Sequence, residues 1–207
     1  MRPFIHINCA MSADGKIAGS ERKQVRISSQ EDKDRVKTLR RTYDAILVGV
    51  GTIVSDDPHL TVKGRTFEEN QIRVVIDPNG RIPLDALVLD DRAKTVVAVK
   101  TGIKKEIPGA EIVECGETFD LDILMESLSD MGIGSILVEG GGETIASFFR
   151  KGLVDRYTVF IGSKIIGGRS SPTPADGDGW VMDEGFPLRL TGAEVLGDGV
   201  LISYERV

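Results

Sequence analysis

The chain has 207 residues, of which 41% are hydrophobic and 28% charged, and its formal net charge is −6. This length suits one large domain or two small ones, and the composition is that of an ordinary globular protein. The 26 Lys and Arg residues form no basic block, and no apolar run approaches the roughly 18 residues that a membrane span needs. We therefore expect neither a nucleic-acid partner nor a membrane partner.

The N-terminus and the cysteines favour a cytoplasmic protein. Met1 leads directly into a strand-like segment, without the charged and apolar regions of a signal peptide. Cys9 and Cys115 lie alone in strand-like segments and form no CxxC pair. We expect both cysteines to behave as small buried hydrophobes.

In chain order, the predicted elements alternate between strands and helices. Helices are predicted over 30–42, with Ser28 or Ser29 as the cap, over 120–131, and in a short segment that ends near Gly152. Strands are predicted over 4–11, 45–50, 73–77, 95–99, 112–115, 135–138, 156–161, 188–196 and 201–207. The alternation implies a mostly parallel sheet covered on both faces, in a single three-layer α/β/α domain over residues 1–207.

Two turns stand out at the end of this pattern. Gly197-Asp198-Gly199 joins the last two strands, which predicts an antiparallel C-terminal edge. The residues at 176–185 form the segment that we most expect to be mobile.

The segment 45–61 is the first candidate ligand site. The strand predicted over 45–50 is continuously apolar apart from Gly49, and Gly51 follows it. The two glycines predict a turn. Thr52, Asp56 and Asp57 come after this turn. Open α/β sheets bind ligands at the carboxyl ends of their strands. Asp57 precedes a proline and is interpreted as a turn residue.

A second candidate site follows the strand at 135–138. Glu139 ends that strand, and a carboxylate there needs a partner or a function if it is buried. The three glycines at 140–142 would let backbone N–H groups approach an anion, next to the positive end of the following helix. Both glycine turns lack the third glycine of GxGxxG, which disfavours a Rossmann domain.

The remaining residues favour chemistry that is borrowed from a cofactor. His6 and His59 have no metal-ligand spacing, and the motifs of zinc deaminases and of GxSxG hydrolases do not occur. We therefore expect no metal. A chain without a metal, a nucleophile or a hydrolytic dyad needs a cofactor to carry out a reaction.

Seven motifs together resemble the riboflavin-biosynthesis reductases. They are AMSADGKIA (10–18), RIS (26–28), LRR (39–41), DAILVGVGT (44–52), DDPHLT (56–61), RVVID (73–77) and VEGGG (138–142). The resemblance covers essentially the whole chain and is strongest to the stand-alone archaeal form, because the chain has neither the motifs nor the room for a deaminase domain. It implies the fold of dihydrofolate reductase, with a mixed sheet.

The resemblance also implies roles for individual residues. The residues at cofactor-binding positions are Ala10, Thr52, Asp56, Gly141, Gly142, Glu143, Thr144, Ile145, Ala146 and Ser147. The residues at substrate-binding positions are Arg40, Leu60, Lys63 and Glu139. The chain departs from the bacterial pattern at Lys63 (usually Arg), Pro78 (usually Ser) and Arg26 (usually Trp). Lys63 keeps the charge but lacks the bidentate fork of Arg.

The implied reaction is reduction of the ribosyl side chain of 2,5-diamino-6-ribosylamino-4(3H)-pyrimidinone 5′-phosphate to the ribitylamino compound. NADPH is the expected cofactor, with NADH as the alternative, and the family implies a homodimer. Glu139 would accept hydrogen bonds from the pyrimidine, and Arg40 or Lys63 would hold the 5′-phosphate. Asp56 would contact the ribosyl hydroxyls or lie near the C1′ imine; no proton donor is assigned.

Three alternatives stay open at this point. The substrate could be the deaminated pyrimidine, as in the bacterial order of reactions, or a pteridine such as dihydrofolate. Arg40, Leu60 and Glu139 together argue against a pteridine. A dinucleotide-binding module without catalysis is the alternative outside the enzymes.

Overall fold

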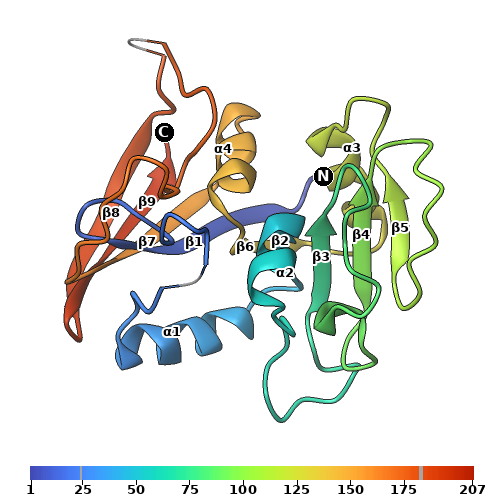
Figure 1. Ribbon diagram of the computed structural model, residues 1–207, viewed down its shortest axis with the longest axis horizontal. Coiled ribbons are helices and arrows are strands. Elements are labelled where there is room, and N and C mark those ends of the chain that lie inside the picture. The colour runs from blue at the N-terminus through green and yellow to red at the C-terminus, as the bar shows by residue number, and fades with distance from the viewer. Residues whose placement is uncertain (24, 182–183) are drawn as a thin grey trace. The chain divides into compact units, whose positions relative to one another are not determined.

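The computed structural model describes residues 1–23, 25–181 and 184–207. The chain forms two compact units (Figure 1). The first unit consists of Met1–Phe4 and Leu39–Leu137, and the second consists of Ile5–Thr38 and Val138–Val207. Each unit is described by itself.

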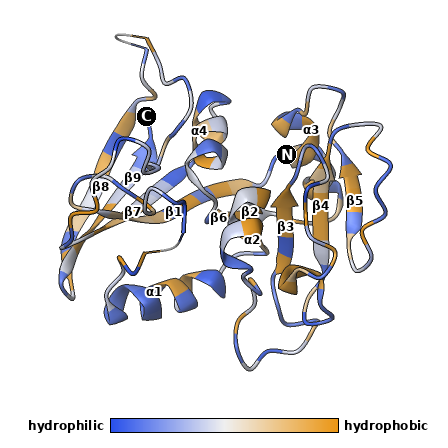
Figure 2. Ribbon diagram, in the orientation of Figure 1, coloured by the Kyte–Doolittle hydropathy of each residue, from blue (hydrophilic) through white to orange (hydrophobic). Residues whose placement is uncertain are grey.

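The first unit is built on parallel strands. Strands β5 (Glu111–Glu114), β4 (Thr95–Val99), β3 (Ile72–Ile76) and β2 (Ala45–Gly49) are neighbours in this order, and β6 (Ser135–Val138) lies next to β2. All residues of β2 and β4 are buried, which explains their continuous apolar sequences. Figure 2 shows β3 and β4 coloured mostly as hydrophobic.

Two helices and one short 3-10 helix belong to the first unit. Helix α3 (Leu121–Asp130) buries a stripe of apolar side chains, and its cap Asp120 accepts a hydrogen bond from the N–H of Asp122 at 3.0 Å. Helix α2 is Val50–Asp56, and the 3-10 helix η1 is Leu87–Leu89. The predicted helix over 120–131 is therefore confirmed.

The predicted glycine turn after β2 is wrong. Helix α2 begins at Val50, directly after the strand, so that Gly51 lies inside the helix and Gly49 is its N-cap with φ −81°. Val50 and Ile53, one helical turn apart, are both buried in the core. Burial of this pair outweighs the roughly 1 kcal/mol by which Gly disfavours a helix interior.

The second unit carries the antiparallel edge. Strand β1 (Phe4–Ser12) pairs in parallel with β7 (Arg156–Gly162), while β9 (Gly199–Arg206) pairs antiparallel with both β7 and β8 (Leu188–Leu196). Leu196 pairs with Gly199, so the connecting turn has two central residues, and the first of them, Gly197, has φ 60°. The predicted antiparallel C-terminal edge is confirmed.

Helices α1 (Gln30–Arg40) and α4 (Gly142–Arg150) complete the description of the elements. The Ser29 hydroxyl accepts a hydrogen bond from the N–H of Asp32 at 3.1 Å, which confirms one of the two predicted caps. On α4, the Phe149 ring meets Tyr157 of β7 edge-on, with 5.5 Å between ring centroids. In Figure 1, α4 lies beside β7 and β9.

A polar network fastens α1 to β1. Asp32 is buried and pairs with Arg35 at 2.8 Å, and Arg35 also donates to Asn8 at 2.7 Å. Thr158 donates to the same Asn8 oxygen and contacts His6 Nε2 at 2.9 Å. Burial, followed by the charges of Arg156 and Arg35, lowers the pKa of His6 to about 3. The buried residue of α1 is thus an acid, Asp32.

Candidate active site

The start of α4 is the most accessible part of the predicted cofactor segment. Gly141 is the N-cap, with φ −62°, and a Cβ placed there would meet no atom within 4 Å. The first bond of the helix runs from the N–H of Ile145 to the carbonyl of Gly141 at 3.1 Å. The N–H groups of the first turn therefore precede the helical ladder, in a position that attracts anions.

The neighbouring position is closed by the chain itself. A Cβ at Gly142 would collide with the carbonyl oxygen of Thr173 and would lie 2.8 Å from Asp176 Oδ2. Asp176 is fixed here, because its N–H donates to the Gly142 carbonyl at 3.2 Å and its carboxylate accepts from Thr173. The turn is therefore open at the Cβ position of Gly141 and packed at that of Gly142.

Few side chains of the predicted cofactor segment can reach a ligand. Ile145 and Ala146 are fully buried, and the Ser147 hydroxyl is used on the carbonyls of Glu143 and Thr144. Glu143 is exposed, with Oε1 3.8 Å from Arg22 Nη1, and Thr144 is half-buried, so these two side chains are at least partly open to solvent. Two further predicted residues of this unit are half-buried: Ala10 on β1 and Glu139, directly after β6.

The other predicted residues belong to the first unit. Thr52 and Asp56 lie four residues apart on α2, and therefore on one face of it; Thr52 is half-buried and Asp56 exposed. Arg40, the last residue of α1, is half-buried, and Lys63 is exposed. Leu60 is only 3% exposed and belongs to the hydrophobic core, so only its backbone is available to a substrate.

Two carboxylates of the motifs, Asp57 and Asp14, have structural roles. The carboxylate of Asp57, which has φ 41° at the end of α2, accepts a hydrogen bond from the N–H of Leu87 at 2.8 Å. Asp14 accepts from the Ser12 hydroxyl and from the N–H groups of Ile166 and Gly167, and these bonds lower its pKa to about 2. Asp57 is thus the C-cap of α2 rather than part of a plain turn.

The sequence pattern did not reveal a buried arginine of the first unit, Arg73. Arg73 on β3 is fully buried and pairs with Asp90 at 2.7 Å. Burial of the Asp90 carboxyl raises its pKa, but hydrogen bonds from the Arg73 side chain and the Arg92 N–H outweigh this and lower it overall. The signal that could have revealed the network is a charged residue within the otherwise apolar run of β3.

The cysteines have no reactive environment. Cys115 is buried, and Cys9 is half-buried, with its sulfur 3.5 Å from the Tyr157 hydroxyl. Burial raises the pKa of both thiols to about 11. Both cysteines therefore stay protonated thiols at neutral pH.

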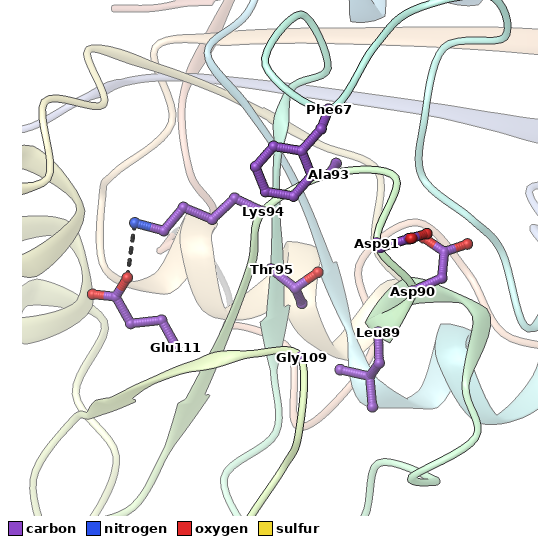
Figure 3. Close-up of a pocket in the computed structure, with 9 residues that line it drawn as sticks. All are labelled: Phe67, Leu89, Asp90, Asp91, Ala93, Lys94, Thr95, Gly109 and Glu111. Atoms are coloured by element: carbon purple, nitrogen blue, oxygen red, sulfur yellow. Dashed lines mark ion pairs between the residues drawn. The ribbon is translucent and has the colours of Figure 1, made fainter.

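Two surface cavities lie within the units. One, of about 280 Å³, lies beside the start of β4, where Lys94 and Glu111 form an ion pair of 2.7 Å and the Phe67 ring stands opposite Ala93 (Figure 3). None of the predicted site residues lines it. The other, of about 480 Å³, lies in the second unit and includes Arg26, Ser28 and Lys164.

Residues 1–23, 25–181 and 184–207 contain neither a metal-binding cluster nor a helix that could span a membrane. No group of three or more His, Cys, Asp and Glu side chains there has the geometry to hold a metal ion. Over the same residues, every helix is too short or too polar to cross a membrane.

Comparison with known proteins identifies the family. A family model described as the RibD C-terminal domain matches residues 3–202. The chain belongs to this family. Among curated RibD-type relatives, the 2,5-diamino-6-ribosylamino-4(3H)-pyrimidinone 5′-phosphate reductase of Archaeoglobus fulgidus is 39% identical, over 98% of this chain and 98% of its own length.

Solved structures of the RibD family share the fold. RibD of Acinetobacter baumannii superposes with a TM-score of 0.84 at 22% identity, and this chain covers 58% of its length. The riboflavin biosynthesis reductase Rib7 of Saccharomyces cerevisiae superposes with a TM-score of 0.78 at 23% identity, and 90% of its length is covered. At these identities the likeness shows the fold alone, and it confirms the predicted dihydrofolate-reductase-like class with its mostly parallel sheet and antiparallel edge.

Proposed function

We propose that this protein reduces 2,5-diamino-6-ribosylamino-4(3H)-pyrimidinone 5′-phosphate to its ribitylamino form, using NADPH. The observation that carries the proposal is the match, at 39% identity and nearly full length on both sides, to an archaeal reductase named for this substrate. We treat residues 1–207 as one reductase domain, because the match extends over 98% of this chain.

The start of α4 is suited to the phosphates of a dinucleotide. The open space at Gly141 leaves room for an anion against the backbone, and the helix dipole favours negative charge there. We therefore assign Gly141, Glu143 and Thr144 to direct contact with the cofactor, with Gly142, Ile145, Ala146 and Ser147 contributing through the helix that they build. Thr52 and Asp56 on α2, together with Ala10 on β1, are the other proposed cofactor residues.

The substrate residues divide by chemistry. Glu139 offers a carboxylate to the amino groups of the pyrimidine, and Arg40 and Lys63 offer cations to the 5′-phosphate. Lys63 is exposed, which leaves its charge at the surface for an incoming dianion. The backbone of Leu60 completes the set, because its side chain is used in the core.

The bound nicotinamide would supply a hydride to C1′ of the opened ribosylamine. What the chain itself contributes is position: Glu139 orients the ring, Arg40 and Lys63 anchor the phosphate, and Asp56 is suited to the ribosyl hydroxyls. Fixing both ends of the substrate lowers the entropy cost of the reaction, which is a large effect in itself. No proton donor is assigned.

The test is NADPH oxidation, followed at 340 nm with purified protein, with the diamino compound and its deaminated counterpart compared. We expect turnover of the diamino compound. Preference for the deaminated compound would support the bacterial order of reactions. Turnover of neither would contradict the reductase and favour a binding module, while turnover of dihydrofolate would favour a pteridine reductase. NADH in parallel assays decides the cofactor. The homodimer and the cytoplasmic location stay predictions.

A further inference from the structure

The segment that carries the proposed substrate residues Leu60 and Lys63 is held in an unfavourable backbone conformation. Asp57 and Leu60 both have positive φ, 41° and 51°. Side chains other than Gly, Asn and Asp rarely adopt this region, and a buried leucine in it needs support from its surroundings. The support comes from His59, the residue directly before Leu60.

Hydrogen bonds hold both the side chain and the backbone of His59. Its Nδ1 lies 3.1 Å from Asp90 Oδ2, and its carbonyl oxygen lies 3.5 Å from an N–H nitrogen of Arg73. A carboxylate can only accept, so Nδ1 carries the hydrogen and donates. His59 is half-buried, so the bond to Asp90 is partly protected from water.

Arg73 makes this anchor rigid. Its Nε donates to the Thr95 hydroxyl at 2.8 Å, and its terminal nitrogens donate to the carboxylate and carbonyl of Asp90 and to the carbonyls of Ala93 and His59. All five guanidinium N–H groups therefore have acceptors. An arginine that is fully buried and fully bonded has no alternative rotamer, and Asp90 is consequently fixed as well.

We infer that His59, through Asp90 and Arg73, is a positioning residue that sets the backbone of residues 57–63 for substrate binding. It touches neither substrate nor cofactor. Its effect passes through the next residue, Leu60, whose backbone is a proposed substrate contact, and on to Lys63. The inference rests on the proposed function, since it assigns a purpose to the geometry of the proposed substrate segment.

The experiment compares three variants of the full chain. His59→Ala removes the donor to Asp90. His59→Asn restores it, because the Asn amide nitrogen stands close to where Nδ1 does. Arg92→Ala is the matched control: Arg92 is exposed, and its Nε pairs with the same carboxylate oxygen at 3.1 Å from outside the segment 57–63.

Steady-state kinetics and amide hydrogen exchange provide independent measurements. For His59→Ala we expect KM for the diamino pyrimidine to rise about tenfold, as is typical when a hydrogen bond to a charged group is lost, while KM for NADPH stays unchanged. Exchange of the amides in 57–63 should become faster. His59→Asn should recover most of both effects, and Arg92→Ala should behave as wild type.

The outcomes separate this inference from the proposed function. An unchanged substrate KM in His59→Ala, an equal rise of both KM values, or no recovery in His59→Asn would overturn the positioning role. If the wild type turns over neither pyrimidine, the proposed function fails, and hydrogen exchange alone then decides. Faster exchange confined to 57–63 would support the anchor, and unchanged exchange would overturn it.

Discussion

Alanine substitutions at the adjacent residues Gly141 and Gly142 test the proposed cofactor site most directly. The added methyl group would point into open space at Gly141 and against other residues of the chain at Gly142. Gly142→Ala places a methyl group against the Thr173 carbonyl and 2.8 Å from Asp176 Oδ2. Gly141→Ala places the same methyl group where no atom lies within 4 Å. Neither glycine has positive φ, so backbone strain does not complicate the comparison.

The expected cost of Gly142→Ala follows from the bonds that must yield. The backbone carbonyl of Thr173 cannot rotate away, so the segment at 173–176 must shift. That shift would break the bond from the Asp176 N–H to the Gly142 carbonyl, at 3.2 Å, and the bond from Arg150 to the Asp176 carbonyl, also 3.2 Å. Two hydrogen bonds at about 0.5–1.5 kcal/mol each make about 1–3 kcal/mol, the range that is usual for overpacking. Higher helix propensity returns up to about 1 kcal/mol of the middle value of about 2 kcal/mol, so we expect a net loss of about 1–2 kcal/mol.

Gly141→Ala should separate stability from binding. We expect its unfolding free energy to stay within about 1 kcal/mol of wild type, because Ala is only a poorer N-cap than Gly. Its NADPH affinity should fall at least tenfold, since the methyl group occupies the open side of the turn. Urea unfolding followed by circular dichroism and NADPH titration by fluorescence provide the two numbers. Unchanged affinity in Gly141→Ala would refute the cofactor assignment, and unchanged stability in Gly142→Ala would refute the close contact with Thr173.

Three further predictions concern single residues. Glu139→Gln should weaken pyrimidine binding more than NADPH binding, and equal losses measured by calorimetry would argue against its role. Arg73→Met should cost about 3–5 kcal/mol in urea unfolding, because the partners of a fully buried cation are left unpaired. The depressed pKa of His6, about 3 against the ordinary 6.5, means that the unfolded state binds the extra proton. Stability should be complete above pH 6.5 and decline as the pH falls toward 3; His6→Gln should flatten this slope, and an unaltered slope would contradict the assignment.

The fold was largely predictable because its signals are local. The strands of the first unit are buried on both faces and read as apolar runs, and the two-residue turn at Gly197 marks the antiparallel hairpin. The error at α2 arose where local and tertiary preferences disagree. Gly49 and Gly51 suggest a turn, while the buried pair Val50 and Ile53 requires a helix. Residue propensities include the turn preference of the glycines, but they do not include the burial of Val50 and Ile53 in the folded core.

The resemblance predicts which residues form the site, but the sequence does not show how each of them is placed. The sequence suggested that residues 140–142 are glycines so that an anion can approach the backbone. In the structure Gly142 makes room for Thr173, thirty-one residues later in the sequence, and the open space lies at Gly141. Leu60 shows the same limit, because a leucine that matches a substrate position has its side chain in the core. Arg73, Asp90 and His59 come together only after the chain folds, so their spacing in the sequence does not predict the network. A sequence motif thus predicts candidate residues for a ligand site. Whether each residue offers its side chain or its backbone, and which residues hold it in place, depends on contacts between segments that are distant in the sequence.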